Sequence, residues 1–168
     1  MKWSVKFIIS LTAIMFVLIS CDFIRDIFPN GKSKITFRAS TTSKTNQADT
    51  VLFTGDDIKW LNGTTGEVCF VDSLTIPKAF SFHRIKCYLG TDSLFTASMT
   101  SNYMSSILND LVLNHNLQDG KYYFSDGYPD YIENVGAKNV RIQNKEKRAV
   151  AWTRFTDELK KEGRYVIK

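Results

Sequence analysis

Apolar and polar residues alternate along several stretches of the central part of the chain, and this pattern predicts β-strands. In residues 34–40 (KITFRAS), Ile35 and Phe37 alternate with polar side chains, as expected for a strand with one buried face. Gly90-Thr91 separates two strand-like runs and favours a tight hairpin between them. By the same criteria, further strands are predicted at residues 67–72, 79–90, 92–101, 121–125 and 164–168.

Two longer stretches carry apolar residues at helical intervals. In residues 103–116 these are Met104, Ile107, Leu108 and Leu111. In residues 145–162 they are Ala149, Trp152, Phe155 and Leu159, with charged residues on the other side. Apolar residues three or four positions apart lie on one face of an α-helix, so each stretch is predicted to be an amphipathic helix.

A third, shorter helix is predicted at residues 55–61. Thr54 followed by Asp57 three residues later matches a capping box, and Asn62-Gly63 is typical of a helix end. Strands followed by helices indicate an α+β fold. We therefore expect a mainly antiparallel sheet with the two long helices packed on one face.

The N-terminal segment has the organisation of an export signal. Two lysines precede a 14-residue apolar stretch, residues 7–20, which is shorter than the roughly 20 residues that a membrane-spanning helix needs. This length suits the apolar region of a secretory signal. The tetrapeptide Leu18-Ile19-Ser20-Cys21 resembles the lipobox of bacterial lipoproteins. The alternative is an ordinary signal peptide, with Cys21 available for a disulfide.

The lipobox resemblance implies that Cys21 is lipidated and becomes the mature N-terminus, which anchors the protein to a membrane. The domain organisation would then be a signal peptide at 1–20, a tether at 21–33 and a single domain at 34–168. The implied location is the bacterial cell envelope, on the periplasmic or outer-membrane face. Asp22 directly follows Cys21. In some Gram-negative bacteria an Asp at that position retains a lipoprotein in the inner membrane, but other phyla read the position differently, so the choice of membrane stays open.

A second resemblance concerns glycosylation. Three tripeptides are similar to the Asp-Ser/Thr-apolar acceptor used for O-glycosylation in Bacteroidota, and their hydroxyl residues are Thr50, Ser73 and Ser93. Asp before Ser or Thr at a strand start is also ordinary turn chemistry. Together with the lipobox and the C-terminal stretch WTRFTDELKKEGRY, these motifs make the chain similar to small uncharacterised Bacteroidota lipoproteins, a family resemblance that implies no activity.

The net charge bears on the class of partner, and the cysteines bear on whether a disulfide can form. The net charge of +5 falls to +3 once Lys2 and Lys6 leave with the signal, and so mild a charge argues against a nucleic-acid partner. Cys69 and Cys87 remain as a candidate disulfide in an oxidising compartment. Each also lies in an apolar run, where a free cysteine behaves as a small hydrophobic residue.

Catalytic and metal-binding patterns are not found in the sequence. The two histidines, His83 and His115, each lie among apolar residues and are interpreted as structural. Cys69 and Cys87 lack the spacing of zinc ligands, and no hydrolase, nucleotide or metalloprotease motif occurs. The sequence therefore predicts no catalytic residue, no metal site and no cofactor.

One tyrosine-rich stretch, residues 121–134, is a candidate binding surface. It ends in Tyr128, Asp130 and Tyr131, in a region that turn residues predict to be a loop. Tyrosine rings beside carboxylates can stack on a sugar and bind its hydroxyls, and they also serve as anchors in protein interfaces. The alternative is that these rings close one edge of the core.

The resulting hypothesis is a non-enzymatic, lipid-anchored envelope protein whose domain binds a ligand or partner of unknown specificity. One alternative is a glycan-binding accessory lipoprotein that uses Tyr128, Asp130 and Tyr131. Another is an inhibitor of an external hydrolase such as a lysozyme. An enzyme stays open as a further alternative, because clusters formed only in space cannot be seen in a sequence.

Overall fold

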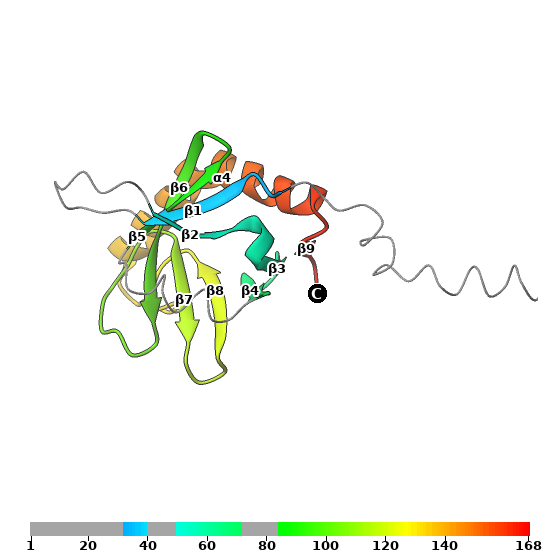
Figure 1. Ribbon diagram of the computed structural model, residues 1–168. Coiled ribbons are helices and arrows are strands. Elements are labelled where there is room, and N and C mark those ends of the chain that lie inside the picture. Colours follow the sequence, from blue (N-terminus) through cyan, green and yellow to red (C-terminus); the bar gives the residue numbers. More distant parts are fainter. Residues whose placement is uncertain (1–31, 40–49, 72–83) are drawn as a thin grey trace, which may run out of the picture. The chain divides into compact units, whose positions relative to one another are not determined.

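A computed structural model describes residues 32–39, 50–71 and 84–168 (Figure 1). The chain divides into two compact units, Met1–Lys32 and Ser33–Lys168. Almost all of the first unit lies outside the described residues, and so does the lipobox with Cys21. Ser73 and His83 also lie outside them.

Nine strands and one α-helix make up the described part of the second unit. The strands are β1 Ile35–Ala39, β2 Val51–Thr54, β3 Ile58–Asn62, β4 Glu67–Phe70, β5 Arg84–Leu89, β6 Asp92–Ser101, β7 Val112–Asn116, β8 Lys121–Ser125 and β9 Tyr165–Val166. One turn of 3-10 helix, η1 Gly55–Asp57, joins β2 to β3, and the α-helix is α4 Val135–Lys161.

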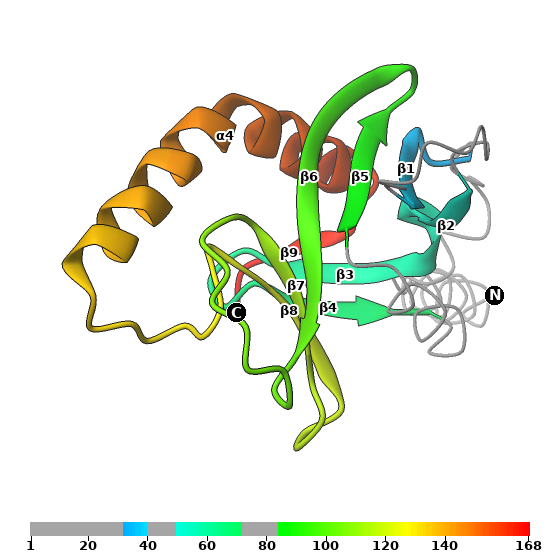
Figure 2. The same ribbon diagram turned by 90° about the vertical axis from the view of Figure 1, so that its left-hand side faces the viewer.

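All nine strands belong to one sheet, in the order β2-β1-β5-β6-β7-β8-β4-β3-β9. Neighbouring strands are antiparallel except in the β6–β7 and β3–β9 pairs. Six strands separate β2 from β3 in this order, yet only η1 joins them in the chain. The sheet must therefore curl back on itself, and Figure 2 shows β3 and β4 running across the far end of the curl.

Aromatic side chains fill the inside of the curl. Phe37 on β1 stacks on Phe53 with ring centroids 4.4 Å apart, and it meets Phe155 of α4 edge to face at 5.9 Å. Phe95 and Phe124 complete this cluster from β6 and β8. Burying one such side chain stabilises the fold by about 1.5–3 kcal/mol, so this cluster is the main attachment of α4 to the sheet.

The helix α4 confirms the predicted helix at 145–162 but begins ten residues earlier. Asn134 caps its first turn, because the Asn134 side-chain oxygen accepts a hydrogen bond from the Ala137 N–H at 3.0 Å. The C-terminal half buries Phe155 and Leu159 in the core. Figure 2 shows the N-terminal half arching away from the sheet, toward the loop that precedes it.

The helix predicted at 103–116 is wrong. Residues Val112–Asn116 form β7, paired with β6 on one side and β8 on the other, while Met104 and Ile107 of the expected apolar stripe are exposed. Val112 and Leu113 are both fully buried although their side chains point to opposite faces of the sheet. A strand buried on both faces has no alternation, and its short apolar run cannot be distinguished from a helix by spacing.

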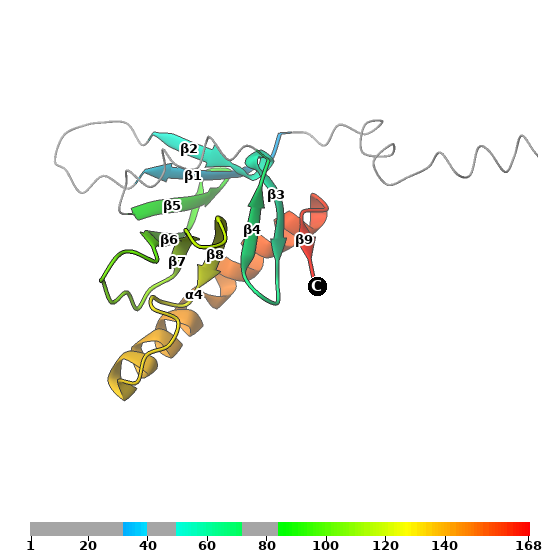
Figure 3. The same ribbon diagram turned by 90° about the horizontal axis from the view of Figure 1, so that it is seen from below.

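The short helix predicted at 55–61 is also wrong beyond its first turn. The capping box forms as expected, with the Thr54 N–H donating to the Asp57 carboxylate at 2.7 Å. The turn ends at Asp57, however, and Ile58–Asn62 continues as β3 because pairing with β4 and β9 satisfies its backbone. The expected α+β fold with two packed helices is thereby replaced by a curled nine-stranded sheet with one α-helix in the described residues (Figure 3).

Candidate functional site

Tyr128, Asp130 and Tyr131 lie on the loop between β8 and α4. Tyr128 is half-buried and pairs through its backbone with Leu108, whereas Tyr131 is 73% exposed and its hydroxyl donates to Glu133 at 3.4 Å. Neither tyrosine lines either of the two pockets described below, and nor does Asp130. The structure therefore places these three residues on an open loop.

A buried arginine of α4 holds this loop. Arg141 is 8% exposed, and its guanidinium donates to the Pro129 carbonyl at 2.8 Å, the Leu108 carbonyl at 3.1 Å and the Asn109 side chain at 3.2 Å. A Cβ atom on Gly127 would overlap the same guanidinium, so only glycine fits there. Arg141 thus joins two loops to the helix and has a structural role that the sequence pattern did not reveal.

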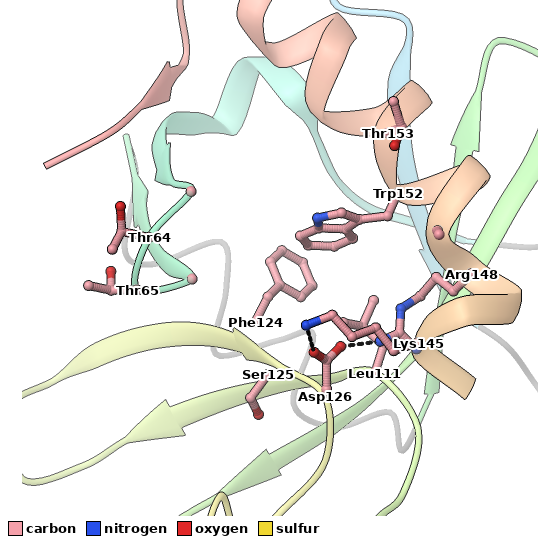
Figure 4. A pocket seen from close by; sticks show the side chains of 13 residues that line it. Thr64, Thr65, Leu111, Phe124, Ser125, Asp126, Lys145, Arg148, Trp152 and Thr153 are labelled. Carbon is pink, nitrogen blue, oxygen red and sulfur yellow. Dashed lines mark hydrogen bonds and ion pairs between the residues drawn. The ribbon is translucent and has the colours of Figure 1, made fainter. Parts of the chain in front are cut away.

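A concavity lies under the middle of α4 (Figure 4). It is a pocket of about 330 Å³ between the β3–β4 turn, the end of β8 and one face of the helix. The residues that line it are Gly63, Thr64, Thr65, Gly66, Leu111, Phe124, Ser125, Asp126, Lys145, Arg148, Ala149, Trp152 and Thr153. We call it the helix pocket.

Two aromatic rings form one wall of the helix pocket. Trp152 of α4 and Phe124 of β8 lie edge to face, with ring centroids 5.5 Å apart. Trp152 also contacts Phe95 at 5.6 Å and Phe155 at 5.3 Å, so the core holds its indole in place. Trp152 stays partly accessible at the pocket surface, which makes it a rigid, preformed apolar contact.

A charged triplet lies beside this wall. The Asp126 carboxylate, at the end of β8, receives Lys145 Nζ at 2.8 Å and also pairs with the Arg148 guanidinium. The Arg148 side chain is 11% exposed and the Lys145 side chain 68%. The Arg148 pair therefore contributes more to holding α4 on β8, whereas the exposed lysine can turn toward a ligand at little cost.

The third wall is the turn between β3 and β4. Asn62 is buried, and its side-chain oxygen accepts from the N–H groups of Thr64 at 2.9 Å and Thr65 at 3.3 Å. Gly66 has a φ of +74°, and a Cβ atom there would overlap the Phe124 carbonyl oxygen. The turn is thereby fixed close to β8, with Thr64 and Thr65 on the exposed side of the helix pocket.

A second pocket of about 470 Å³ lies on the other side of Arg148 and Leu111, which line both pockets. It is bounded by β5, β6 and α4, and we call it the basic pocket. The residues that line it are Arg84, Lys86, Leu94, Phe95, Thr96, Ser98, Asp110, Leu111, Asn144, Lys147 and Arg148. Four of these are cations and only Asp110 is a carboxylate.

Cys69, Cys87 and His115 line neither of the two pockets. Cys69 and Cys87 are free thiols and are not joined in the structure. Cys87 is fully buried in the core, and this burial raises the pKa of its thiol, so it is held as an unreactive hydrophobic group. His115 stacks on Tyr122 at 4.3 Å, and desolvation lowers its pKa against an opposing effect of Asp119.

Two of the three candidate O-glycosylation residues lie within the described part of the chain. Thr50 and Ser93 are exposed, Thr50 just before β2 and Ser93 near the start of β6, whereas Ser73 lies outside the described residues. Within the described part of the chain, no three His, Cys, Asp or Glu side chains are grouped so as to hold a metal ion. No helix there is long and apolar enough to cross a membrane.

Comparisons with protein-family models, with curated proteins and with solved structures found no match. The interpretation of the helix pocket therefore rests on its own residues. Sequence reasoning assigned Trp152 to a helical core stripe and did not select Asp126, Lys145 or Arg148. The available signal was the i,i+3 spacing of Lys145 and Arg148, which places both cations on one side of α4.

Proposed function

We propose that this chain is a lipid-anchored protein of the bacterial cell envelope whose domain binds a sugar residue of a glycan in the helix pocket, without chemical turnover. The observation that carries the proposal is the meeting of the Trp152 and Phe124 rings with the Asp126, Lys145 and Arg148 triplet in one concavity. The binding site proposed from the sequence is moved accordingly from the loop at Tyr128 to the helix pocket.

The chemistry of a pyranose matches these walls. The C–H bonds on one face of a sugar ring are weakly positive, and they pack well on the negative face of an aromatic ring. The hydroxyls at the rim of the sugar bind charged donors and acceptors more strongly than neutral ones. A volume of about 330 Å³ is at the lower end of typical ligand pockets, which suits one sugar residue.

The number of carboxylates that line the helix pocket favours binding of a sugar over hydrolysis of a glycosidic bond. A typical glycosidase needs two carboxyl groups on either side of the scissile bond. Of the residues that line the helix pocket, only Asp126 has a carboxylate, and it is engaged by Lys145 and Arg148. It therefore lacks the second carboxyl group that such hydrolysis needs.

The envelope location rests on the N-terminal sequence. The apolar stretch 7–20 is followed by Leu18-Ile19-Ser20-Cys21 in lipobox order. Lipidation at Cys21 would supply more than one acyl chain, which is what stable anchoring needs. A test is the mobility of the precursor in cells treated with a lipoprotein signal-peptidase inhibitor such as globomycin: precursor accumulation supports the anchor, and unchanged processing contradicts it.

The pocket is tested with the full-length protein in detergent micelles on a glycan array, followed by titration of each glycan that binds. Lys145→Ala removes an exposed pocket cation, and Lys138→Ala is the matched control because it is an exposed lysine of α4 outside both pockets. Loss of one charge-assisted contact should weaken binding about tenfold, which corresponds to about 1.4 kcal/mol. Absence of glycan binding, or equal binding by the two variants, would refute the proposed site.

A further inference from the structure

The basic pocket lies beside the first half of β6, where this strand is paired on one side only. Strand β7 pairs with β6 only from Ser98 onward, so the first half of β6 has β5 on one side and no paired strand on the other in the described residues. The helix α4 passes beside β6 (Figure 2). The Arg154 guanidinium donates to the Asp92 carboxylate at 2.7 Å. The basic pocket lies between this edge of β6 and the helix.

Its cations are only partly neutralised. Arg84 and Asp110 are 3.7 Å apart and both about half exposed, so this pair is weak. Arg148 is engaged by Asp126 at the border with the helix pocket. Within the described part of the chain, Lys86 and Lys147 have no ion-pair partner. The lining residues therefore carry three more positive than negative charges, gathered in a concavity.

Such a surface selects a compact anion. Like charges that line a concave, partly apolar wall concentrate the field inside it and raise the local concentration of anions. An arginine fork and lysine ammonium groups are the side chains that bind sulfate and phosphate oxygens. Leu94 and Phe95 supply an apolar wall beside these cations, so the group that carries the anion can be partly apolar.

The two pockets are contiguous, since Arg148 and Leu111 line both. A glycan residue in the helix pocket can therefore place a neighbouring charged group in the basic pocket. We infer that the ligand is an anionic glycan, and that the basic pocket binds a sulfate or phosphate ester on it. This inference rests on the proposed function, which assigns a sugar to the helix pocket. It adds that the ligand carries a negatively charged ester.

The test uses one polymer backbone with different charged groups: dextran, carboxymethyl dextran, dextran phosphate and dextran sulfate of equal length. Binding to the full-length protein is measured by titration calorimetry at two salt concentrations. We expect the sulfate or phosphate polymer to bind at least about tenfold more tightly than neutral dextran. The comparison of the two esters identifies which oxyanion the basic pocket prefers. Equal binding of charged and neutral polymers would overturn the inference.

Matched variants separate the basic pocket from the general positive charge of the protein. The double variant Lys86→Gln/Lys147→Gln removes two pocket charges, and Lys34→Gln/Lys59→Gln removes two exposed lysines that line neither pocket. The first should weaken binding of the ester-bearing polymer about tenfold and the second should leave it within about twofold. Equal weakening by both double variants would overturn the inference.

The two proposals fail in different ways. Lys86 and Lys147 do not line the helix pocket, so neutral glycans selected on the array should bind their double variant as they bind the original protein. If neutral glycans bind but the esters bring no gain, the inference fails while the proposed function stands. If no glycan binds, charged or neutral, the proposed function itself fails.

Discussion

Arg148, in the middle of α4, pairs with Asp126 at the end of β8; Asp126 lines the helix pocket, and Arg148 lines both the helix pocket and the basic pocket. The Arg148 side chain is 11% exposed and that of Asp126 39%. A half-buried pair of this kind fixes the distance between helix and strand. The pair therefore helps to hold α4 on β8 beside the helix pocket.

Replacing Arg148 by Ala should destabilise the domain and leave Asp126 with only the exposed Lys145. We expect a loss of about 1–3 kcal/mol in the free energy of unfolding, because a partly buried carboxylate loses a charged partner. Urea denaturation measures it. Lys145→Ala is the control, since its pair is exposed and should contribute less than about 1 kcal/mol. Equal effects of the two substitutions would contradict this assignment.

Arg141 should prove essential for the order of residues 127–134. Arg141→Ala removes the charged donor from the Pro129 carbonyl and the Asn109 side chain, whereas the Leu108 carbonyl keeps the Tyr128 N–H. Each hydrogen bond to a charged group contributes about 1.5–3 kcal/mol. Arg141→Lys should not restore stability, because an ammonium group cannot reproduce the planar fork. Hydrogen exchange should show faster amide exchange in residues 127–134 in both variants. Unchanged protection in the lysine variant would contradict the role of the fork.

Gly66 should be more sensitive to substitution than Gly90, another glycine in a turn with positive φ. At Gly66, Ala is opposed both by the positive φ and by overlap with the Phe124 carbonyl oxygen. Gly90 is a matched control, because its φ is also positive, +63°, but nothing lies within 4 Å of an added Cβ atom. Gly90→Ala should cost about 1–2 kcal/mol and Gly66→Ala clearly more, by thermal or urea unfolding. Similar losses would contradict the close approach of the turn to β8.

Glu162 should make stability fall as pH rises above its ordinary pKa. Desolvation raises the pKa of this carboxyl above 4.5, against the hydrogen bond from Ser33 and the charge of Arg164. The folded state therefore binds the proton more tightly than the unfolded state does. The associated stability is fully present below pH 4.5 and is lost as pH rises through the raised pKa.

This linkage is measured as the difference in unfolding free energy between the original protein and Glu162→Gln across pH 4 to 7. The variant cannot titrate at this position, so the difference isolates the carboxyl. We expect the original protein to lose stability relative to the variant with rising pH. A relative gain over this range would contradict the raised pKa.

Local patterns predicted the strands better than the helices. Residues 92–101 and 121–125 form strands with the predicted limits, since each has one polar or exposed side that marks the alternation. The region of β7 resisted prediction because Val112 and Leu113 are buried on opposite faces, a property that depends on strands far away in the sequence. Similarly, Ile58–Asn62 has helix-like flanks, and only its pairing with β4 and β9 makes it a strand.

The helix pocket could not be predicted for the same reason. Its walls come from Thr64, Phe124, Asp126 and Trp152, which lie on three separate elements and meet only after the sheet has curled. The sequence did indicate a binding surface near residues 121–134, and Asp126 lies in that range. Tyr128 and Tyr131, the predicted binding residues, lie on an open loop, whereas the partly exposed aromatic contact of the pocket is Trp152 from α4.

Binding of a glycan in the helix pocket is tested most directly by NMR. The indole N–H signals of the full-length protein are followed during titration with a glycan selected on the array. Trp152 lines the helix pocket, Trp60 lies outside it on β3, and the third tryptophan, Trp3, belongs to the predicted signal peptide. Trp152→Phe and Trp60→Phe assign the signals of these two residues. We expect the chemical shift of the Trp152 signal to change in a saturable manner, while that of the Trp60 signal does not change. Saturable binding of the glycan with an unchanged Trp152 signal would contradict the central claim.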